Sequence, residues 1–247
     1  IRKSVYNAAP YLKSDRIAFL NNPYGMAHER LDFSISERKE DQNMNVLLVN
    51  GSPHEKGCTY TALSEVAKAL EENGVSTAID PIGTKPVHGC IACQKCVESG
   101  KCVFSDDVCN DLLGRMQKAD GIVVGSPVYY AGPNGALCAL LDRIFYSGGS
   151  TLANKPAACV VSCRRGGASA AFDRLNKYFT ISRMPVVTSQ YWNSVHGNTP
   201  DEVRRDLEGL QTMRELGRNM AWMLKSIEKA NIAAPRQEPW VATNFIR

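Results

Sequence analysis

A short apolar run that ends abruptly in a polar loop constrains this chain most strongly. Residues 46–49 read Val-Leu-Leu-Val, and the sequence Asn-Gly-Ser-Pro follows them directly. A run that is apolar on both faces is typical of a central strand in a parallel sheet that helices cover on each side. An amphipathic helix is predicted to begin near Thr59. The segment therefore predicts a strand, a loop and a helix in succession.

The same alternation continues along the chain. The further predicted strands are residues 76–80, 121–125, 157–162 and 185–189. Amphipathic segments separate them, and a last helix is predicted to begin at a capping box, with Thr199 as the cap and proline at the first helical position. We expect one α/β domain over residues 45–229, with a doubly wound, five-stranded parallel sheet in the order 2-1-3-4-5. The loops after strands 1, 3 and 4 should then converge at one edge.

The two ends of the chain differ from this repeat. Residues 1–44 contain scattered aromatic residues, two prolines and no sustained period. This N-terminal extension is either an arm that packs on a partner subunit or a poorly ordered lead-in, and its apolar content favours the arm. Residues 230–247 are expected to form a C-terminal tail.

Composition and charge argue against several classes of protein. The net charge of +4 is not gathered into a basic patch, so we do not expect a nucleic-acid partner. No apolar run approaches the roughly 20 residues of a membrane helix, and we see no secretory signal. The nine cysteines, four of them within thirteen residues, favour a cytoplasmic, reducing setting with metal or redox use.

The loop after the first strand has the features of an anion site. Free N–H groups and the dipole at a helix start favour negative charge. The hydroxyls of Ser52, Thr59 and Thr61 add donors, whereas His54 and Lys56 either add positive charge or are solvated. Because the loop matches neither GxGxxG nor GxxxxGK[ST], it suits one terminal phosphomonoester, as in FMN. The alternative is an ordinary turn with a helix cap.

Two further loops are expected at the same edge. The loop after the third strand contains Tyr129 and Tyr130, and tyrosine offers an aromatic ligand a flat apolar face, although it could also cap the sheet edge. The loop after the fourth strand reads Arg-Arg-Gly-Gly, and its glycines let the backbone approach a ligand closely. An arginine there would stabilise an anionic reduced flavin, grip the phosphate of a pyridine nucleotide, or remain a surface charge.

Three segments of the chain resemble signatures of the NADPH-dependent FMN reductase family, within the flavodoxin-like superfamily. They read NGSPHEKGCTYTAL, GCIACQKCVESGKCVFSDD and SPVYYAGPNGALCALLDR, and the resemblance covers about residues 45–226. The residues that it assigns to FMN are Ser52, Gly57, Cys58, Thr59 and Tyr60 at the phosphate, Pro127, Val128, Tyr129, Tyr130, Ala131 and Gly132 along the ring, and Arg164, Arg165, Gly166 and Gly167 on the other side. We add His54 for its charge. Many relatives carry asparagine in place of Cys58, so the contact there would depend on the backbone N–H.

Four cysteines follow the pattern Cys90-x2-Cys93-x2-Cys96-x5-Cys102. Such compact spacing is typical of iron–sulfur ligation, because one short loop can wrap a cubane. Structural zinc sites usually use pairs about a dozen residues apart. The segment also resembles that of the iron–sulfur flavoproteins, a branch of the same family, in which these positions would ligate a [4Fe–4S] cluster. Free thiols in a loop that covers the flavin, or a zinc site, are the alternatives.

The resemblance implies an FMN-dependent NAD(P)H oxidoreductase that passes electrons to a quinone, flavin, azo or nitro acceptor. The alternative is an iron–sulfur flavoprotein that relays single electrons from a ferredoxin-like donor, and a weaker one is a flavin-dependent sensor. No catalytic acid or base is predicted, since the cofactor performs the chemistry. Family members usually pair across the flavin edge, so a homodimer or tetramer is expected.

Overall fold

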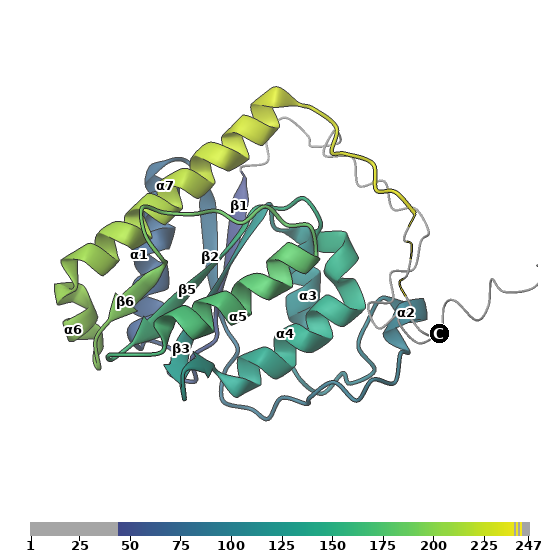
Figure 1. The fold of residues 1–247 in the computed structure, drawn as a ribbon, viewed down its shortest axis with the longest axis horizontal. Helices are drawn as coiled ribbons and strands as arrows, with labels where there is room; N and C mark the ends of the chain where they lie inside the picture. The colour runs from purple at the N-terminus through teal and green to yellow at the C-terminus, as the bar shows by residue number, and fades with distance from the viewer. Residues whose placement is uncertain (1–43, 240, 242, 244–247) are drawn as a thin grey trace, which may run out of the picture.

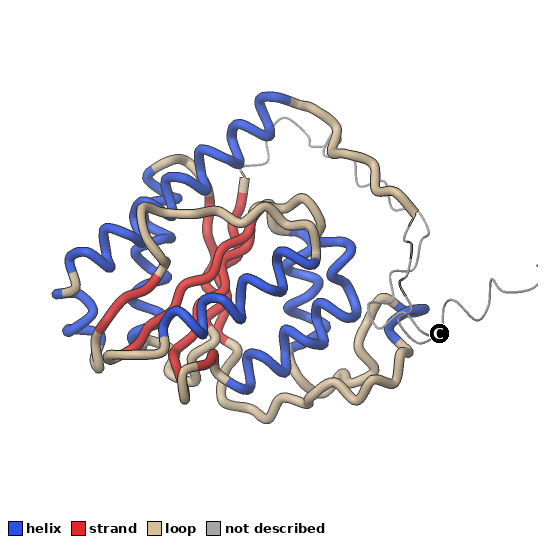
Figure 2. The backbone as a smooth tube through the Cα atoms, in the orientation of Figure 1, coloured by secondary structure: helices blue, strands red, loops and turns tan. Residues whose placement is uncertain are grey.

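A computed structural model of the protein describes residues 44–239, 241 and 243. A parallel sheet runs through the middle of this part of the chain, with helices on both faces (Figures 1 and 2). The predicted α/β class and the doubly wound arrangement are therefore confirmed. The predicted arm lies outside the described residues except for Met44, and so does part of the predicted tail.

Five parallel strands form the sheet in the described part of the chain, in the order β2-β1-β3-β5-β6. The strands are β1 (Asn45–Asn50), β2 (Ser76–Pro81), β3 (Gly121–Tyr129), β5 (Ala157–Cys163) and β6 (Ser194–His196). A short strand, β4 (Gly132–Pro133), folds back antiparallel on the end of β3. Counted along the chain without β4, this order is the predicted 2-1-3-4-5.

Helices pack on both faces of the sheet and make two hydrophobic cores. One face carries α1 (Cys58–Glu72), α6 (Pro200–Arg205) and α7 (Leu207–Ala230), and the other carries α3 (Cys109–Lys118), α4 (Gly135–Gly148) and α5 (Ala168–Ile181). Within β1, Val46 and Leu48 enter the first core, whereas Leu47 and Val49 enter the second. Because successive side chains of a strand point to opposite faces, a strand with two covered faces is apolar throughout.

The fifth strand does not lie where the apolar run at residues 185–189 predicted it. That run makes a single bridge, between Val186 and Ala157, and the chain then leaves the sheet. It returns at β6, where only Val195 is buried among three residues. The run pairs only through the carbonyl of Pro185 and the N–H of Val187, both bonded to Ala157, and the prediction was wrong because a three-residue edge strand leaves no apolar run in the sequence.

The predicted last helix is divided in two at Asp206. Thr199 caps the first part as predicted, since its hydroxyl accepts a hydrogen bond from the N–H of Glu202 at 3.2 Å. The carboxylate of Asp206 accepts hydrogen bonds from the N–H of Gly209 at 2.9 Å and from the N–H of His196 at 2.7 Å. Asp206 thus starts α7 and ties it to β6. None of the helices among the described residues is long and apolar enough to cross a membrane.

Two short helices complete the fold. The first, α2 (Cys96–Ser99), interrupts the long connection between β2 and α3, and the second, the 3-10 helix η2 (Gly149–Leu152), follows α4. Figure 1 shows α2 beyond α3 and α4, at a distance from the sheet. A connection of this length inside a compact domain is usually functional.

Candidate functional site

The loops after β1, β3, β5 and β6 meet at the carboxyl edge of the sheet. The N–H of Gly51, just after β1, donates to the carbonyl of Gly125 within β3 at 2.8 Å. The N–H of Gly197, just after β6, donates to the carbonyl of Cys163, the last residue of β5, at 3.1 Å. This edge is where ligands bind in doubly wound folds.

The loop after β1 is shaped by a buried side chain that no motif pointed to. The side chain of Asn50 accepts a hydrogen bond from the N–H of Ser52 at 3.1 Å and donates one to the carbonyl of Glu55 at 3.1 Å. The hydroxyl of Ser52 in turn accepts from the N–H of His54 at 3.1 Å. A polar residue at the end of a buried strand was the sequence signal for this role.

The structure limits the hydroxyl groups that this loop can offer to a ligand. The buried hydroxyl of Thr59 lies 2.8 Å from that of Ser162, and the hydroxyl of Thr61 donates to the carbonyl of Gly57 at 3.1 Å. Thr61 thus uses its O–H within the protein, and Thr59 shares a hydrogen bond with Ser162 in which either hydroxyl can donate. The Ser52 hydroxyl accepts from the N–H of His54, which leaves its own O–H for a ligand.

Helix α1 begins without a side-chain cap. Its N-cap residue is Gly57, and no cap hydrogen bond is formed from that position in the described chain. The first N–H groups of a helix have no intrahelical partner, so those of Cys58, Thr59 and Tyr60 are suited to an anion. Burial raises the pKa of the Cys58 thiol, so this side chain is neutral beside the helix start.

His54 is exposed but lies beside Gly57, where an added Cβ would be 2.9 Å from the Cβ of His54. The side chain of Tyr60 lines a hollow between α1 and β2 together with Lys56 and Ile79.

The loops after β3 and β5 touch each other directly. Gly167 has a φ of 90°, and a Cβ at this position would lie 2.7 Å from the Cα of Ala131. Tyr130 and Ala131 also adopt left-handed backbone conformations, with φ of 49° and 59°. Non-glycine residues rarely adopt such angles, and where they do the strain often marks a binding loop.

The remaining predicted residues line the rim of this contact. Tyr129, Tyr130 and Ala131 are exposed, as are Arg164, Arg165 and Gly166, whereas Pro127, Val128, Gly132 and Gly167 are half-buried. Helix α5 starts at Gly167, again without a side-chain cap in the described chain. A close backbone approach beside two uncapped helix starts suits a flat ring with a phosphate tail, so these residues fit FMN.

The four cysteines predicted as ligands line one pocket between the β2–α3 connection and α4. Burial raises the pKa of the Cys96 thiol, and the neighbouring thiols of Cys93, Cys102 and Cys90 raise it further. The Sγ of Cys96 also lies 3.9 Å from the carbonyl oxygen of Tyr146 in α4. All nine cysteines of the chain are free thiols.

The arrangement of these sulfur atoms bears on what they can hold. Among the described residues, no three Cys, His, Asp or Glu side chains are placed to share one metal ion, as a zinc site requires. A cubane instead takes one sulfur at each of four iron corners, so its ligands line a cavity. Ala92 and Gln94, between the cysteines, have left-handed φ of 52° and 59°, and both line the pocket. Four thiols that line one pocket are the donor set of a [4Fe–4S] cluster, so the residues present fit it by their chemistry.

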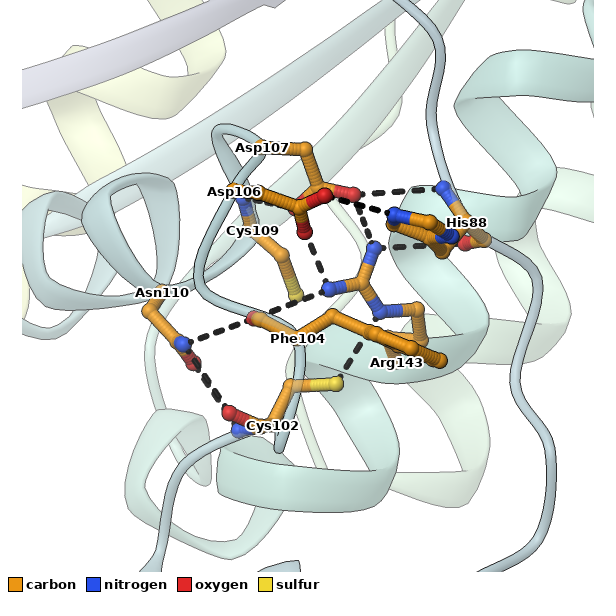
Figure 3. Close-up of polar contacts among 8 residues, drawn as sticks. All are labelled: His88, Cys102, Phe104, Asp106, Asp107, Cys109, Asn110 and Arg143. Carbon is orange, nitrogen blue, oxygen red and sulfur yellow. Dashed lines mark hydrogen bonds and ion pairs between the residues drawn. The ribbon is translucent and has the colours of Figure 1, made fainter.

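A buried ion pair between Arg143 and Asp107 adjoins this pocket, and no sequence motif identified it (Figure 3). Arg143 of α4 pairs with Asp107, and their side chains are 1% and 3% exposed. Burial by itself would raise the pKa of Asp107, but hydrogen bonds from Arg143 and from the N–H groups of Cys109 and His88 hold it below its ordinary value. An arginine late in an otherwise apolar helix face was the available sequence signal.

The sequence model of the family described as NADPH-dependent FMN reductase matches residues 44–199. The chain belongs to this family. An iron–sulfur flavoprotein of Methanocaldococcus jannaschii is 36% identical over 194 residues, which cover 75% of this chain and 100% of that protein. One of Methanosarcina thermophila is 28% identical over 191 residues, which cover 75% and 98%. These relatives confirm that the chain lies close to the iron–sulfur flavoprotein branch of the FMN reductase family.

Solved structures support the fold of this FMN reductase family member. RosB with a bound riboflavin-phosphate intermediate has a TM-score of 0.62 at 13% identity, covering 83% of this chain and 92% of RosB. An azoreductase of Bacillus anthracis has a TM-score of 0.52 at 14% identity, covering 71% and 99%. At such identities the likeness shows the flavodoxin-like fold alone. Family membership makes the protein an FMN-dependent oxidoreductase.

Proposed function

We propose that the protein is an iron–sulfur flavoprotein, in which FMN at the carboxyl edge of the sheet exchanges electrons with a [4Fe–4S] cluster on Cys90, Cys93, Cys96 and Cys102. The observation that carries the proposal is the single pocket that all four thiols line. FMN supports this role because, when bound, it accepts electrons singly or as a hydride. The names of the full-length relatives point the same way.

The chain's own residues would bind and orient the flavin. The N–H groups of Cys58 and Thr59, with the hydroxyl of Ser52, would hold the phosphate. The contact between Gly167 and Ala131 would place the ring against backbone and keep water from that side. Arg164 or Arg165 would offset negative charge on the ring.

A second candidate is direct reduction by NAD(P)H, with transfer to a quinone, flavin, azo or nitro acceptor. The observation that favours it is the exposure of Arg164 and Arg165, in the loop that touches the β3 loop through Gly167, since arginine suits the phosphate of a pyridine nucleotide. The two candidates share the FMN site and differ in the reductant.

Anaerobically purified protein separates the two candidates. The iron–sulfur flavoprotein should contain FMN with about four iron and four sulfide per chain. Dithionite or a reduced ferredoxin should bleach both centres, and NADPH should bleach the flavin only slowly. Yellow, iron-free protein that NADPH reduces rapidly would favour the second candidate. Colourless protein that takes up no FMN would contradict both.

We also propose that the protein forms a homodimer or tetramer. Tyr129 and Tyr130 are exposed aromatic residues at the carboxyl end of β3, and Tyr191 and Trp192 are exposed in the segment that precedes the edge strand β6. A second copy would cover apolar surface of this kind. Light scattering of the FMN-bound protein tests this. A mass equal to the 27.1 kDa of one chain would contradict it.

A further inference from the structure

Every N–H donor of Arg143 is directed at the cysteine segment and its flanks. Arginine carries five N–H donors in a rigid fork. The Nε–H donates to the Sγ of Cys102 at 3.1 Å (Figure 3). One Nη donates to the carbonyl of His88 at 3.2 Å and to Asp107, and the other donates to the carbonyl of Phe104 at 3.3 Å and to Asp107 at 3.1 Å. Five donors thus meet five acceptors.

These bonds close the cysteine segment at both ends. His88 precedes Cys90 by two residues and Phe104 follows Cys102 by two, and their rings stack with centroids 4.3 Å apart. Arg143 donates to the backbone carbonyls of both His88 and Phe104, and its guanidinium lies 5.4 Å from the centre of the Phe104 ring. A segment whose ends are fixed loses less entropy when its middle is ordered.

A second side chain holds Cys102 from the opposite side. The Asn110 side chain of α3 accepts from the N–H of Cys102 at 2.9 Å and donates to its carbonyl at 3.0 Å. The backbone and the sulfur of Cys102 are therefore fixed separately, the first by Asn110 and the second by Arg143. Cys102 is the predicted ligand farthest along the chain from the other three.

The charge on Arg143 supports a role in geometry. A buried ion pair costs desolvation energy and is often no more stabilising than apolar residues of similar volume. Arg143 is also part of the wall of the pocket that the cysteines line. Burying the Arg143 guanidinium in this wall costs desolvation energy that an apolar side chain, packed in the same place, would not.

We propose that Arg143 is the positioning residue of the cysteine segment, which fixes the Sγ of Cys102 in the pocket wall and stabilises the bound cluster in its reduced state. The first part concerns the protein's own thiols, and the second rests on the proposed [4Fe–4S] function. When the cluster takes up one electron from a donor such as dithionite, its charge becomes more negative by one. A charged N–H donor on a ligand sulfur favours that state and raises the reduction potential.

The sharpest variant is Arg143→Lys, because it keeps the charge but offers three donors on one nitrogen, which cannot reach Cys102, Asp107 and two carbonyls together. The double variant Arg143→Gln with Asp107→Asn removes both charges, so that neither is left buried and unpaired. The matched control is Arg174→Gln, whose ion pair with Asp142 also involves α4 but is 45% exposed on both sides. FMN content and far-UV circular dichroism report the fold of all four proteins.

Amide hydrogen exchange tests the positioning role, and a redox titration tests the effect on the cluster. Amide hydrogen exchange of the as-isolated full chain should become about tenfold faster within residues 88–104 in both Arg143 variants, because the segment opens locally. In an anaerobic dithionite titration of the two Arg143 variants, the equilibrium constant for cluster reduction should be about tenfold lower than in the wild-type protein, because both variants lose the N–H donor to Cys102. For one electron this corresponds to a reduction potential about 59 mV lower. The Arg174 control should match the wild-type protein in both.

A different result would contradict each part of the proposal. Unchanged exchange in residues 88–104 of Arg143→Lys, in protein with normal FMN content, would overturn the positioning role. An unchanged potential with full iron content would overturn the redox role. Wild-type protein that holds no iron after reconstitution would overturn the proposed function and the redox role together, whereas the exchange measurement would still decide the positioning role.

Discussion

Two neighbouring glycines of the candidate FMN site meet different surroundings. Gly167 has a left-handed backbone and no room for a Cβ beside Ala131. Gly166 has open space, with no atom within 4 Å of an added Cβ. The sequence alone gives both glycines the same role, and the fold separates them. At the scale of single residues, the contact between the β3 and β5 loops therefore depends on Gly167.

Replacing Gly167 by alanine should weaken FMN binding about tenfold or more, because the new methyl group forces the two loops apart and a left-handed backbone strains any L-residue. Gly166→Ala is the comparison and should weaken FMN binding much less, because its added Cβ meets no protein atom within 4 Å. Fluorescence titration with FMN measures both affinities. Equal affinities in the two variants would show that the contact does not shape the site.

Asp107 gives the protein a pH dependence of known sign. Its pKa in the folded state lies below the ordinary value of 3.8, so its stabilising effect is complete above that value and is lost as the pH falls through the folded-state pKa. The free energy of unfolding should therefore decrease less between pH 5 and about pH 3 in Asp107→Asn than in the wild-type protein. Urea denaturation at each pH measures this, and Asp201→Asn at an exposed pair is the control. Parallel pH profiles for Asp107→Asn and the wild-type protein would contradict the expectation.

At the scale of elements, α4 connects the two predicted redox sites. Its N-cap residue Asn134 ends the loop that runs along the predicted flavin ring, and its side chain accepts from the N–H of Ala136 at 2.8 Å. Its second half carries Arg143 and Tyr146, which contact two of the four cysteines. One rigid helix thus fixes both the β3 loop and the cysteine pocket.

The packing of α7 on α1 depends on a glycine. A Cβ at Gly217 would lie 2.7 Å from the carbonyl oxygen of Val66 and 2.7 Å from the Cβ of Ala69. Gly217→Ala should therefore lower the free energy of unfolding by about 1–3 kcal/mol, in spite of the better helix propensity of alanine. Gly114→Ala in α3 meets no atom within 4 Å and should raise stability by up to about 1 kcal/mol. Chemical denaturation compares the two, and a stabilised Gly217→Ala would contradict this packing.

At the scale of the whole molecule, the candidate FMN site is made by segments far apart in the sequence. The hydrogen bonds from the β1 loop to β3 and from the β6 loop to β5, and the contact between Gly167 and Ala131, form only once the sheet is complete. A ligand that bridges these loops binds the folded state alone, so it must stabilise the whole fold by mass action.

FMN at about 100 times its Kd should stabilise the cofactor-free protein by about 2.7 kcal/mol, which raises Tm by about 5–10 °C. Riboflavin has the same ring but no phosphate, so it should raise Tm by much less. Differential scanning fluorimetry with both ligands measures the difference. An equal rise with riboflavin would place the binding energy in the ring and contradict the predicted phosphate site at α1.

Local patterns in the sequence were sufficient for the parts of the fold that repeat. Helices cover β1, β3 and β5 on both faces, so their apolar runs are visible in a short window, and the edge strand β2 follows a helix that ends at Glu72. The motif-bearing loops after β1, β3 and β5 were located for the same reason. Within the candidate site, the sequence identified the loops and the cysteine pocket but not the state of each side chain.

Only the tertiary structure decided the features that depend on a distant partner. The hydroxyl of Thr59 is bonded to Ser162, the fifth strand is three residues of edge pairing, and Asp206 ends one helix because it also holds β6. The position of Arg143 on an apolar helix face marks it as unusual but does not identify its partners, because its five acceptors lie 36 to 55 residues away along the chain. The sequence determines contacts that recur within a few residues, whereas a contact between remote segments exists only after the chain has folded.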